Sequence, residues 1–349
     1  MRIGTEPLDL GLTLMDSAQC FHWIERDGRY GAVVAGAPVW LWQDGNSIHA
    51  DGACDIETLR RYLDLDRDYA AVIRECAHMP AACRAVGLYP GLRVLNQPPW
   101  EALIAFILSA NNNVARIRTL VRSLCVNYGQ RFDAGGTALY AFPTPQRLAG
   151  CGEDALRALK VGYRAPFLIE TARRVREGFP LDELRRMPYD EAHRLLTTLP
   201  GVGDKVADCV LLFGCGHAEV FPVDVWVARL LREWFGVTCK SRTAMAREAR
   251  ERLGEHAGLI QQFLFHAARM GGVELGIRNE ELKSLRPKPK PKAKNQVNMA
   301  GRKAVRPIDM LTDSFNLYRF EGSQGSNPEG TSEERRRGEG SDCKGKLNS

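Results

Sequence analysis

The stretch Thr198-Leu-Pro-Gly-Val-Gly-Asp-Lys-Val-Ala-Asp-Cys209 decides the fold. An amphipathic helix is expected to end at this stretch, the Pro-Gly-Val-Gly segment predicts a tight turn, and a second helix is expected to begin near Asp204. The pattern therefore predicts a helix–hairpin–helix. Gly201 and Gly203 let the backbone approach a ligand closely, and the free N–H groups that start the second helix suit a phosphate. Because Gly-x-Gly turns between helices are common, the turn alone also fits a plain structural connection.

Lys205 and Asp224 are the candidate catalytic pair. Lys205 lies in the first turn of the second helix, where the helix dipole disfavours a cation and so favours the neutral, nucleophilic amine. Asp224 lies in Phe221-Pro-Val-Asp-Val-Trp226, just before another amphipathic segment. Taken singly, Lys205 also fits a solvated surface lysine and Asp224 a helix N-cap.

The fold class expected from the whole chain is α+β. Short apolar runs between turn signals predict antiparallel strands at residues 18–24, 30–35, 39–43 and 47–50. These strands, with helices at 56–65 and 69–78, form an N-terminal sheet domain over residues 1–90. An all-helical domain over residues 91–282 follows. Its helices are expected at 100–110, 114–128, 144–150, 153–159, 164–178, 181–187, 190–198, 204–214, 225–235, 243–253 and 258–270.

Composition and cysteine spacing predict a protein that works inside a cell. Hydrophobic residues make up 44% and charged residues 26%, as in ordinary globular domains. No apolar run is long enough to span a membrane, and residues 1–14 do not resemble a secretory signal. The ten cysteines are scattered without a Cys-x-x-Cys pair, which favours reduced, buried thiols and cannot supply a cysteine-bound iron–sulfur cluster.

The positive charge of the chain is concentrated near its C-terminus. The net charge is +6, yet residues 1–282 hold 33 bases and 34 acids. Nine Lys or Arg and no acids lie between Lys283 and Ile308, in a Pro-rich segment followed by Gly, Ser and charged residues. We expect residues 283–349 to form a basic linker and a disordered tail. The tail fits added DNA affinity, a nuclear address or a solvated linker equally well. A DNA-binding field on the body must come from local clustering of charge.

Five motifs resemble those of the 8-oxoguanine DNA glycosylase family, within the helix–hairpin–helix (HhH-GPD) superfamily. The resemblance covers residues 8–270. Because five motifs occur in the family's order, agreement by chance is improbable. In chain order, the motifs are Gln19-x-Phe-x-Trp23, Asn111-Asn-Asn-x-Ala-Arg-Ile117, Gly162-Tyr-Arg164, Leu199-Pro-Gly-Val-Gly-x-Lys-Val-Ala-Asp-Cys209 and Pro222-Val-Asp-Val225.

The resemblance implies a bifunctional DNA glycosylase and abasic-site lyase. Lys205 would attack C1′ of the deoxyribose as an oxidised purine leaves, while Asp224 stabilises the positive charge on the sugar. The Schiff base would then allow β-elimination, which nicks the strand. The partner would be double-stranded DNA containing oxidised guanine. The protein would act on it as a monomer, without a membrane and without a catalytic cofactor. The location would be with genomic DNA, in the nucleus of a eukaryote or the cytoplasm and nucleoid of a prokaryote.

The resemblance also implies roles for residues around the extruded base. Asn111 would fill the gap in the duplex, Tyr163 would wedge the stack, and Arg116 and Arg164 would hydrogen-bond the orphaned cytosine. Taken one by one, the same residues fit a helix cap, a core aromatic and solvated charges.

The pocket for the damaged base is expected to contain four residues by the same resemblance. Cys209 and Phe265 would sandwich the base, Gln261 would pair with its edge, and the carbonyl of Ala18 would accept the N7–H of oxidised guanine. Ala18 stands where the commonest family pattern has glycine. A buried thiol and a core phenylalanine are the plain alternatives.

The hairpin is also implied to hold a structural cation. Its ligands would be the backbone carbonyls of Thr197, Leu199 and Val202, and the cation would bridge to a DNA phosphate.

Two positions depart from the commonest family pattern. Trp226 replaces a histidine and Ala268 replaces an aspartate, which suggests a divergent or a prokaryote-like branch and leaves the Lys205 and Asp224 chemistry intact. Two other functions fit the sequence: a glycosylase for another modified purine, and a non-catalytic DNA-binding protein in which Lys205 only contacts phosphate.

Overall fold

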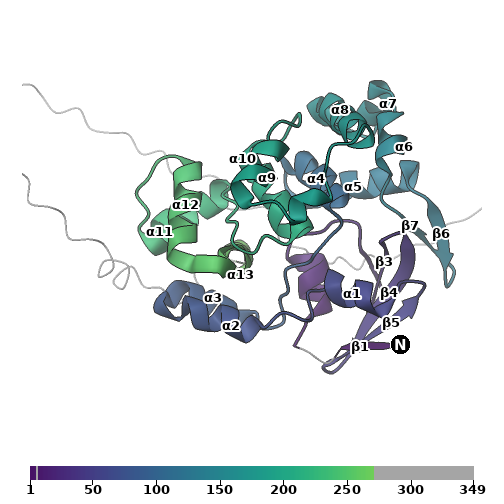
Figure 1. The fold of residues 1–349 in the computed structure, drawn as a ribbon. Coiled ribbons are helices and arrows are strands. Elements are labelled where there is room, and N and C mark those ends of the chain that lie inside the picture. Colours follow the sequence, from purple (N-terminus) through teal and green to yellow (C-terminus); the bar gives the residue numbers. More distant parts are fainter. Residues whose placement is uncertain (5–6, 271–349) are drawn as a thin grey trace, which may run out of the picture. The chain divides into compact units, whose positions relative to one another are not determined.

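An antiparallel sheet forms the N-terminal part of the chain in this computed structural model, which describes residues 1–4 and 7–270. The strand order is β1-β5-β4-β3-β2, so β4 is the central strand (Figure 1). Trp40 on β4 donates a hydrogen bond to the carbonyl of Ala134 in the helical part. The strands are β1 (Arg2–Gly4), β2 (Ile24–Arg26), β3 (Arg29–Val34), β4 (Ala37–Asp44) and β5 (Ser47–Gly52).

Three of the four predicted strands are confirmed as β3, β4 and β5, whereas the strand expected at residues 18–24 is wrong. A π-helical turn over Leu12–Asp16 precedes that segment, and most of the segment is irregular. Gln19 holds it in place by accepting from the amide of Leu95 and donating to the carbonyl of Arg93. These partners are more than 70 residues away, so local alternation of apolar residues cannot report them.

Helices make up most of the remaining described chain. The predicted bounds of residues 114–128 and 225–235 are confirmed by α5 and α11, because Asn113 and Asp224 cap their N-termini. The helices are α1 (Ile56–Tyr62), α2 (Tyr69–Glu75), α3 (Pro80–Leu88), α4 (Pro99–Ser109), α5 (Val114–Tyr128), α6 (Pro145–Ala149), α7 (Glu153–Ala158), α8 (Ala165–Arg176), α9 (Tyr189–Leu196), α10 (Asp204–Val210), α11 (Val225–Phe235), α12 (Arg242–Leu253) and α13 (Ala257–Arg269).

A two-stranded hairpin, helix α3 and the short strands β1 and β2 were not predicted, and one predicted helix is reduced to a single turn. A hairpin of β6 (Arg131–Ala134) and β7 (Thr137–Tyr140) interrupts the helical domain, and α3 fills part of a segment predicted without structure. The helix expected at residues 181–187 is reduced to a 3₁₀ turn at Glu183–Arg185. The α+β class with a helical second part is confirmed, with this hairpin added to it. The tail predicted for residues 283–349 lies outside the described residues.

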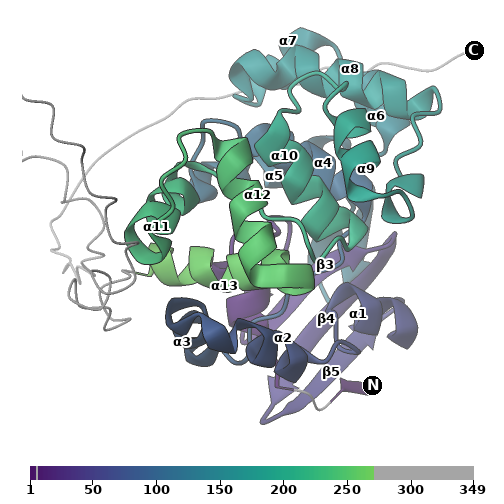
Figure 2. The same cartoon turned by 60° about the vertical axis from the view of Figure 1, so that its left-hand side comes forward.

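Packing between the helices positions the hairpin region. Helix α13 packs on α3 and on α11 and α12, and α10 packs on α4 (Figures 1 and 2). The hydroxyl of Thr243, at the start of α12, donates to the carboxylate of Asp204, at the start of α10, over 2.8 Å. Thus α12 lies beside the N-terminus of α10. No described helix is long and apolar enough to cross a membrane.

Candidate active site

The helix–hairpin–helix consists of α9, a tight turn and α10. Gly201 has φ of +78°, and a Cβ atom there would lie 2.9 Å from the Phe167 ring, so both conformation and space require glycine. Gly203 is different: it caps α10 with φ of −98°, and a Cβ there would have no atom within 4 Å. The turn is therefore held by Gly201, while Gly203 keeps the space in front of the α10 amides open.

Lys205 lies in the first turn of α10 and is half-buried. Its Nζ donates to Oγ of Ser109 on α4 over 3.2 Å and lies 5.1 Å from the centroid of the Phe106 ring. Among the described residues, no carboxylate forms an ion pair with this amine. The amine is thus held by a hydroxyl and an aromatic ring, and none of the described residues provides it with a counter-ion.

Asp224 begins α11 and is also half-buried. One carboxylate oxygen accepts the amide of Val227 over 2.8 Å, as in a helix N-cap. This bond fixes the carboxylate, and a carboxylate retains acceptor capacity for a second group. The cap predicted as the plain alternative therefore exists, and it leaves a catalytic role open.

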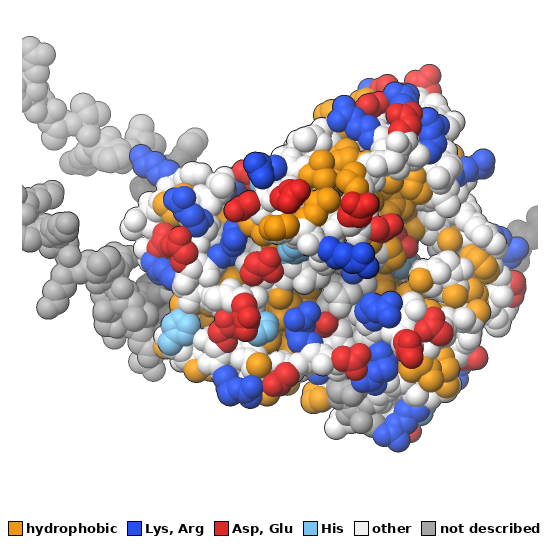
Figure 3. Space-filling model, in the orientation of Figure 1, with side chains coloured by type: hydrophobic (Ala, Val, Ile, Leu, Met, Phe, Trp, Pro, Cys, Tyr) orange, Lys and Arg blue, Asp and Glu red, His pale blue; other side chains and the backbone are white. Residues whose placement is uncertain are grey.

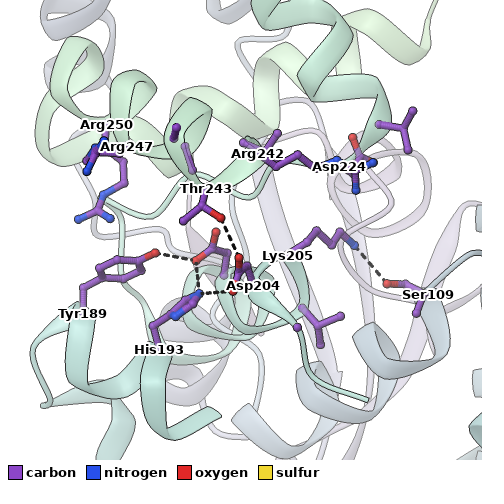
Figure 4. A pocket seen from close by; sticks show the side chains of 18 of the residues that line it. Ser109, Tyr189, His193, Asp204, Lys205, Asp224, Arg242, Thr243, Arg247 and Arg250 are labelled. Atoms are coloured by element: carbon purple, nitrogen blue, oxygen red, sulfur yellow. Dashed lines mark hydrogen bonds and ion pairs between the residues drawn. The ribbon is translucent and has the colours of Figure 1, made fainter. Parts of the chain in front are cut away.

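Lys205 and Asp224 line one cleft of about 1410 Å³. Its walls come from α4, α9, α10, α11 and α12, and Figure 4 shows the Lys205 amine and Asp224 on the same side of the cavity. Acidic and basic side chains alternate over the face shown in Figure 3, with hydrophobic side chains exposed between them. The face has no single strong positive field, in agreement with the near-zero net charge of residues 1–282.

The residues expected around the orphaned base come together at two neighbouring loops. Asn111 is exposed and has φ of +49°. Tyr163 is 51% exposed, and its hydroxyl lies 3.3 Å from the carbonyl of Ala110. Arg116 is exposed and donates to the carbonyl of Lys160. The cap of α5 is Asn113, so Asn111 is free of the capping role that was its plain alternative.

Arg164 is placed differently from its three neighbours. Only 5% of it is exposed, and its guanidinium donates to the carbonyls of Ala110 and Asn111. It also lies 4.5 Å from the Tyr163 ring. In this structure Arg164 holds the Asn111 loop in place, and its contact with a cytosine stays a prediction.

Two of the four predicted base-pocket residues, Gln261 and Phe265, lie on α13, and none of the four lines the cleft. Gln262 donates to the carbonyl of Ser17, which brings α13 next to Ala18. Ala18 has φ of +60°, a left-handed backbone that explains why glycine suits this position. Phe265 is half-buried one helical turn beyond Gln261.

Gln261 and Cys209 are both buried close to the Asp224 loop. The amide nitrogen of Gln261 donates to the carbonyl of Pro222, while its Oε1 has no hydrogen-bond partner within residues 1–4 and 7–270. Burial raises the pKa of the Cys209 thiol to about 11, against the opposing effect of nearby Lys205. A buried acceptor without a donor marks a place where a ligand N–H would be stabilised.

Sequence reasoning missed the wall of the cleft formed by α9 and α12. Tyr189 donates to the buried carboxylate of Asp208 over 2.9 Å, and Nε2 of His193 lies 3.6 Å from the same oxygen. The Arg250 guanidinium stacks over the Tyr189 ring at 3.9 Å. Burial raises the pKa of Asp208 to about 7, which the hydrogen bond from Tyr189 partly offsets. Asp208 lies within the recognised motif, whereas its partners depend on tertiary contacts.

The carbonyls predicted to bind a cation lie in the turn between α9 and α10. The carbonyls of Thr198 and Pro200 accept hydrogen bonds from Arg174 and Thr171 of α8. The predicted ligands are the carbonyls of Thr197, Leu199 and Val202, and the Leu199 carbonyl also accepts the Val202 amide. Within the described ranges there is no cluster of three His, Cys, Asp or Glu side chains suited to a metal.

Two family models match consecutive parts of the chain. Residues 104–255 match the model described as the HhH-GPD superfamily base excision DNA repair protein. Residues 1–103 match the model of the 8-oxoguanine DNA glycosylase N-terminal domain.

Individual relatives agree with these models. The "Probable N-glycosylase/DNA lyase" of Methanothermobacter thermautotrophicus is 36% identical over 203 residues, which are 52% of this chain and 65% of that protein. The N-glycosylase/DNA lyase of Saccharomyces cerevisiae is 37% identical over 161 residues, which are 42% of this chain and 43% of that protein. The chain thus spans less than two thirds of these curated relatives.

A solved structure is similar over nearly its whole length. It is the 8-oxoguanine glycosylase/lyase of Clostridium acetobutylicum in complex with double-stranded DNA containing cytosine opposite 8-oxoguanine. The sequences are 30% identical and the TM-score is 0.72, with 76% of this chain and 93% of that chain covered.

Proposed function

Because this chain belongs to the 8-oxoguanine DNA glycosylase family of the HhH-GPD superfamily, we propose that it is a bifunctional glycosylase and abasic-site lyase for oxidised purines in DNA. The observation that carries the proposal is that Lys205 and Asp224 line the same cleft. An aspartate alone would activate water and release only the base. A lysine beside it adds a nucleophile that remains bonded to the sugar.

In the proposed reaction, the neutral amine of Lys205 forms a bond to C1′ while the bond from C1′ to the base breaks. The base departs with the electron pair of that bond, and a proton from solvent or a nearby group neutralises it. The ammonium formed at Nζ loses one proton, and the bond from C1′ to O4′ then breaks as O4′ takes up a proton, which gives a protonated Schiff base between C1′ and Nζ. The imine acidifies the 2′ hydrogen, whose removal expels the 3′ phosphate and cuts the strand.

Asp224 has an electrostatic role in this reaction. As the base leaves, positive charge develops on the sugar, and a carboxylate held in place stabilises that charge without reorganising. The hydrogen bond from the Val227 amide provides this fixed position. The N-cap of α11 and the catalytic carboxylate are then the same group.

Access to C1′ requires that the damaged nucleotide leave the duplex, at a cost of a few kcal/mol. Asn111 and Tyr163 project from exposed loops and are proposed to occupy and wedge the gap. Arg116, and Arg164 after release from its carbonyl partners, would donate to the acceptors of the orphaned cytosine. Oxidised guanine would enter between Cys209 and Phe265, with Gln261 Oε1 accepting an N–H from its edge.

The partner is therefore double-stranded DNA with oxidised guanine opposite cytosine, and the location is with genomic DNA. The proposed chemistry needs no catalytic cofactor. A cation at the Thr197, Leu199 and Val202 carbonyls would serve docking by joining the hairpin to a phosphate. The protein would act as a monomer, in the nucleus of a eukaryote or in the cytoplasm and nucleoid of a prokaryote.

Strand cleavage with a panel of lesions tests the function. Duplexes carrying 8-oxoguanine opposite each of the four bases are compared with duplexes carrying an alkylated purine. We expect cleavage of 8-oxoguanine opposite cytosine by the wild-type chain and none by Lys205→Gln, which should still bind the duplex. Release of the alkylated purine alone would support the alternative glycosylase, and binding without release of any base would support the non-catalytic alternative.

A further inference from the structure

The cleft is larger than one extruded base requires. A pocket that encloses a small ligand typically measures about 300–1,000 Å³, whereas this cleft measures about 1410 Å³. Lys205 and Asp224 occupy one part of it, and the other part is bounded by α12. The space along α12 is therefore open to a second portion of the ligand.

Two arginines of α12 face this additional space without a partner. Arg242 and Arg247 are exposed and line the cleft, and neither side chain makes a hydrogen bond or an ion pair within the part of the chain that the structure describes. In Figure 4, Arg242 is drawn on the side of the cleft where Asp224 lies, and Arg247 on the side where Tyr189 lies. The five-residue separation along α12 spaces the two positions by about 7.5 Å along the helix axis.

Arg250 completes this wall but is already engaged. Its guanidinium stacks on the Tyr189 ring, whose hydroxyl donates to Asp208. This contact packs α12 against α9. Together with the bond from Thr243 to Asp204, it holds the helix that presents Arg242 and Arg247.

The acidic residues of the cleft do not neutralise these two arginines by direct contact. Asp204 accepts from Thr243, Asp208 accepts from Tyr189, and Asp224 accepts from the Val227 amide. Asp190 and Glu251 also line the cleft and lower its net positive potential. The arginines are thus available for an anion that brings several acceptor oxygens, as a phosphodiester does.

We propose that Arg242 and Arg247 form a phosphate subsite that holds the backbone of the lesion strand next to the extruded nucleotide. This subsite is additional to the hairpin and rests on the proposed function, because it assumes that DNA enters the cleft. Arg242 would contact the phosphate nearest the sugar that faces Asp224, and Arg247 a phosphate farther along α12.

The salt dependence of binding tests the subsite. Fluorescence anisotropy would follow binding of a duplex with a tetrahydrofuran abasic analogue between 50 and 200 mM KCl, for the full chain and for Arg242→Gln/Arg247→Gln. Each lost phosphate contact lowers the slope of log affinity against log salt by about 1, so the double variant should lose about 2. Its affinity at low salt should fall about tenfold or more for each arginine.

Two further variants serve as controls. Arg229→Gln removes an exposed arginine that pairs with Glu233 on α11 and does not line the cleft, so its slope should match that of the wild type. Arg242→Lys/Arg247→Lys keeps both charges and should retain most of the slope.

The subsite is contradicted if the glutamine double variant keeps the wild-type slope, or if Arg229→Gln lowers it equally. The proposed function fails on a different result. Absence of a borohydride-trapped adduct in the wild-type chain would contradict Schiff-base chemistry whatever the salt slope.

Discussion

Replacing each of the two hairpin glycines by alanine should separate stability from DNA docking. In Gly201→Ala, a residue with a Cβ must keep φ of +78°, at a cost of about 1–2 kcal/mol. The new Cβ would also lie 2.9–3.0 Å from three atoms of Phe167, and crowding of this kind costs about 1–3 kcal/mol. The reduced freedom of the unfolded chain returns about 0.4–1 kcal/mol. We expect a net loss of about 2–4 kcal/mol, within the range set by these terms.

Gly203→Ala is the matched control. Its φ of −98° suits any residue and its Cβ would meet nothing within 4 Å, so the free energy of unfolding should fall by less than about 1 kcal/mol. The added methyl group stands before the first amides of α10, where a phosphate would dock. Affinity for duplex DNA should therefore fall about tenfold, as expected for one lost charge-assisted hydrogen bond.

Urea unfolding and duplex binding of both variants provide the measurements. The reasoning is refuted if Gly201→Ala unfolds within about 0.5 kcal/mol of the wild type, less than the smallest cost assigned to its conformation. It is also refuted if Gly203→Ala binds DNA as tightly as the wild type. The first result would show that position 201 does not require glycine. The second would show that the amides at the start of α10 do not bind a DNA phosphate.

Three other perturbations follow from individual side chains. Asp224→Asn keeps a good N-cap, so base release should slow at least tenfold with unfolding changed by less than about 0.5 kcal/mol; an unchanged rate in single-turnover assays would leave Asp224 a cap alone. The Cys209 thiol, with its pKa raised to about 11 by burial, should react with iodoacetamide about 100-fold more slowly in the folded chain than in urea at pH 7.5, and equal rates would contradict its burial. Burial also raises the pKa of Asp208 to about 7 from 3.8, so the folded state holds a proton there that the unfolded state releases. The contribution of this group to the free energy of unfolding is then complete below pH 4 and is lost as the pH rises to 7, by at most roughly 4 kcal/mol. Urea unfolding between pH 4 and 7 should show this loss of stability in the wild type and not in Asp208→Asn. Identical pH profiles for the two proteins would contradict the prediction.

Prediction from sequence succeeded where a local signal sets the structure. Asn113 and Asp224 are side-chain caps that fix the starts of α5 and α11, and Gly236 ends α11 in the left-handed conformation. The β6–β7 hairpin had a local signal too, because Gly135 and Gly136 both have positive φ, as a tight hairpin turn requires. The helical patterns on both sides of this Gly-Gly pair favour helix over a hairpin.

Other features depend on partners distant in sequence. The segment at residues 18–24 alternates like a strand, but Gln19 ties it to Arg93 and Leu95 instead of to a neighbouring strand. Lys205 and Asp224 can be identified from the motifs. Ser109 on α4, whose hydroxyl accepts from the Lys205 amine, cannot. The α12 wall likewise becomes part of the cleft only through tertiary contacts such as that of Thr243 with Asp204.

Borohydride trapping followed by peptide mapping tests the central claim most directly. The wild-type chain is incubated with a duplex containing 8-oxoguanine opposite cytosine, reduced, digested and analysed by mass spectrometry. The account predicts a covalent sugar adduct on Nζ of Lys205, and none with Lys205→Gln. An adduct on another residue, or an undiminished adduct with Lys205→Gln, would contradict it.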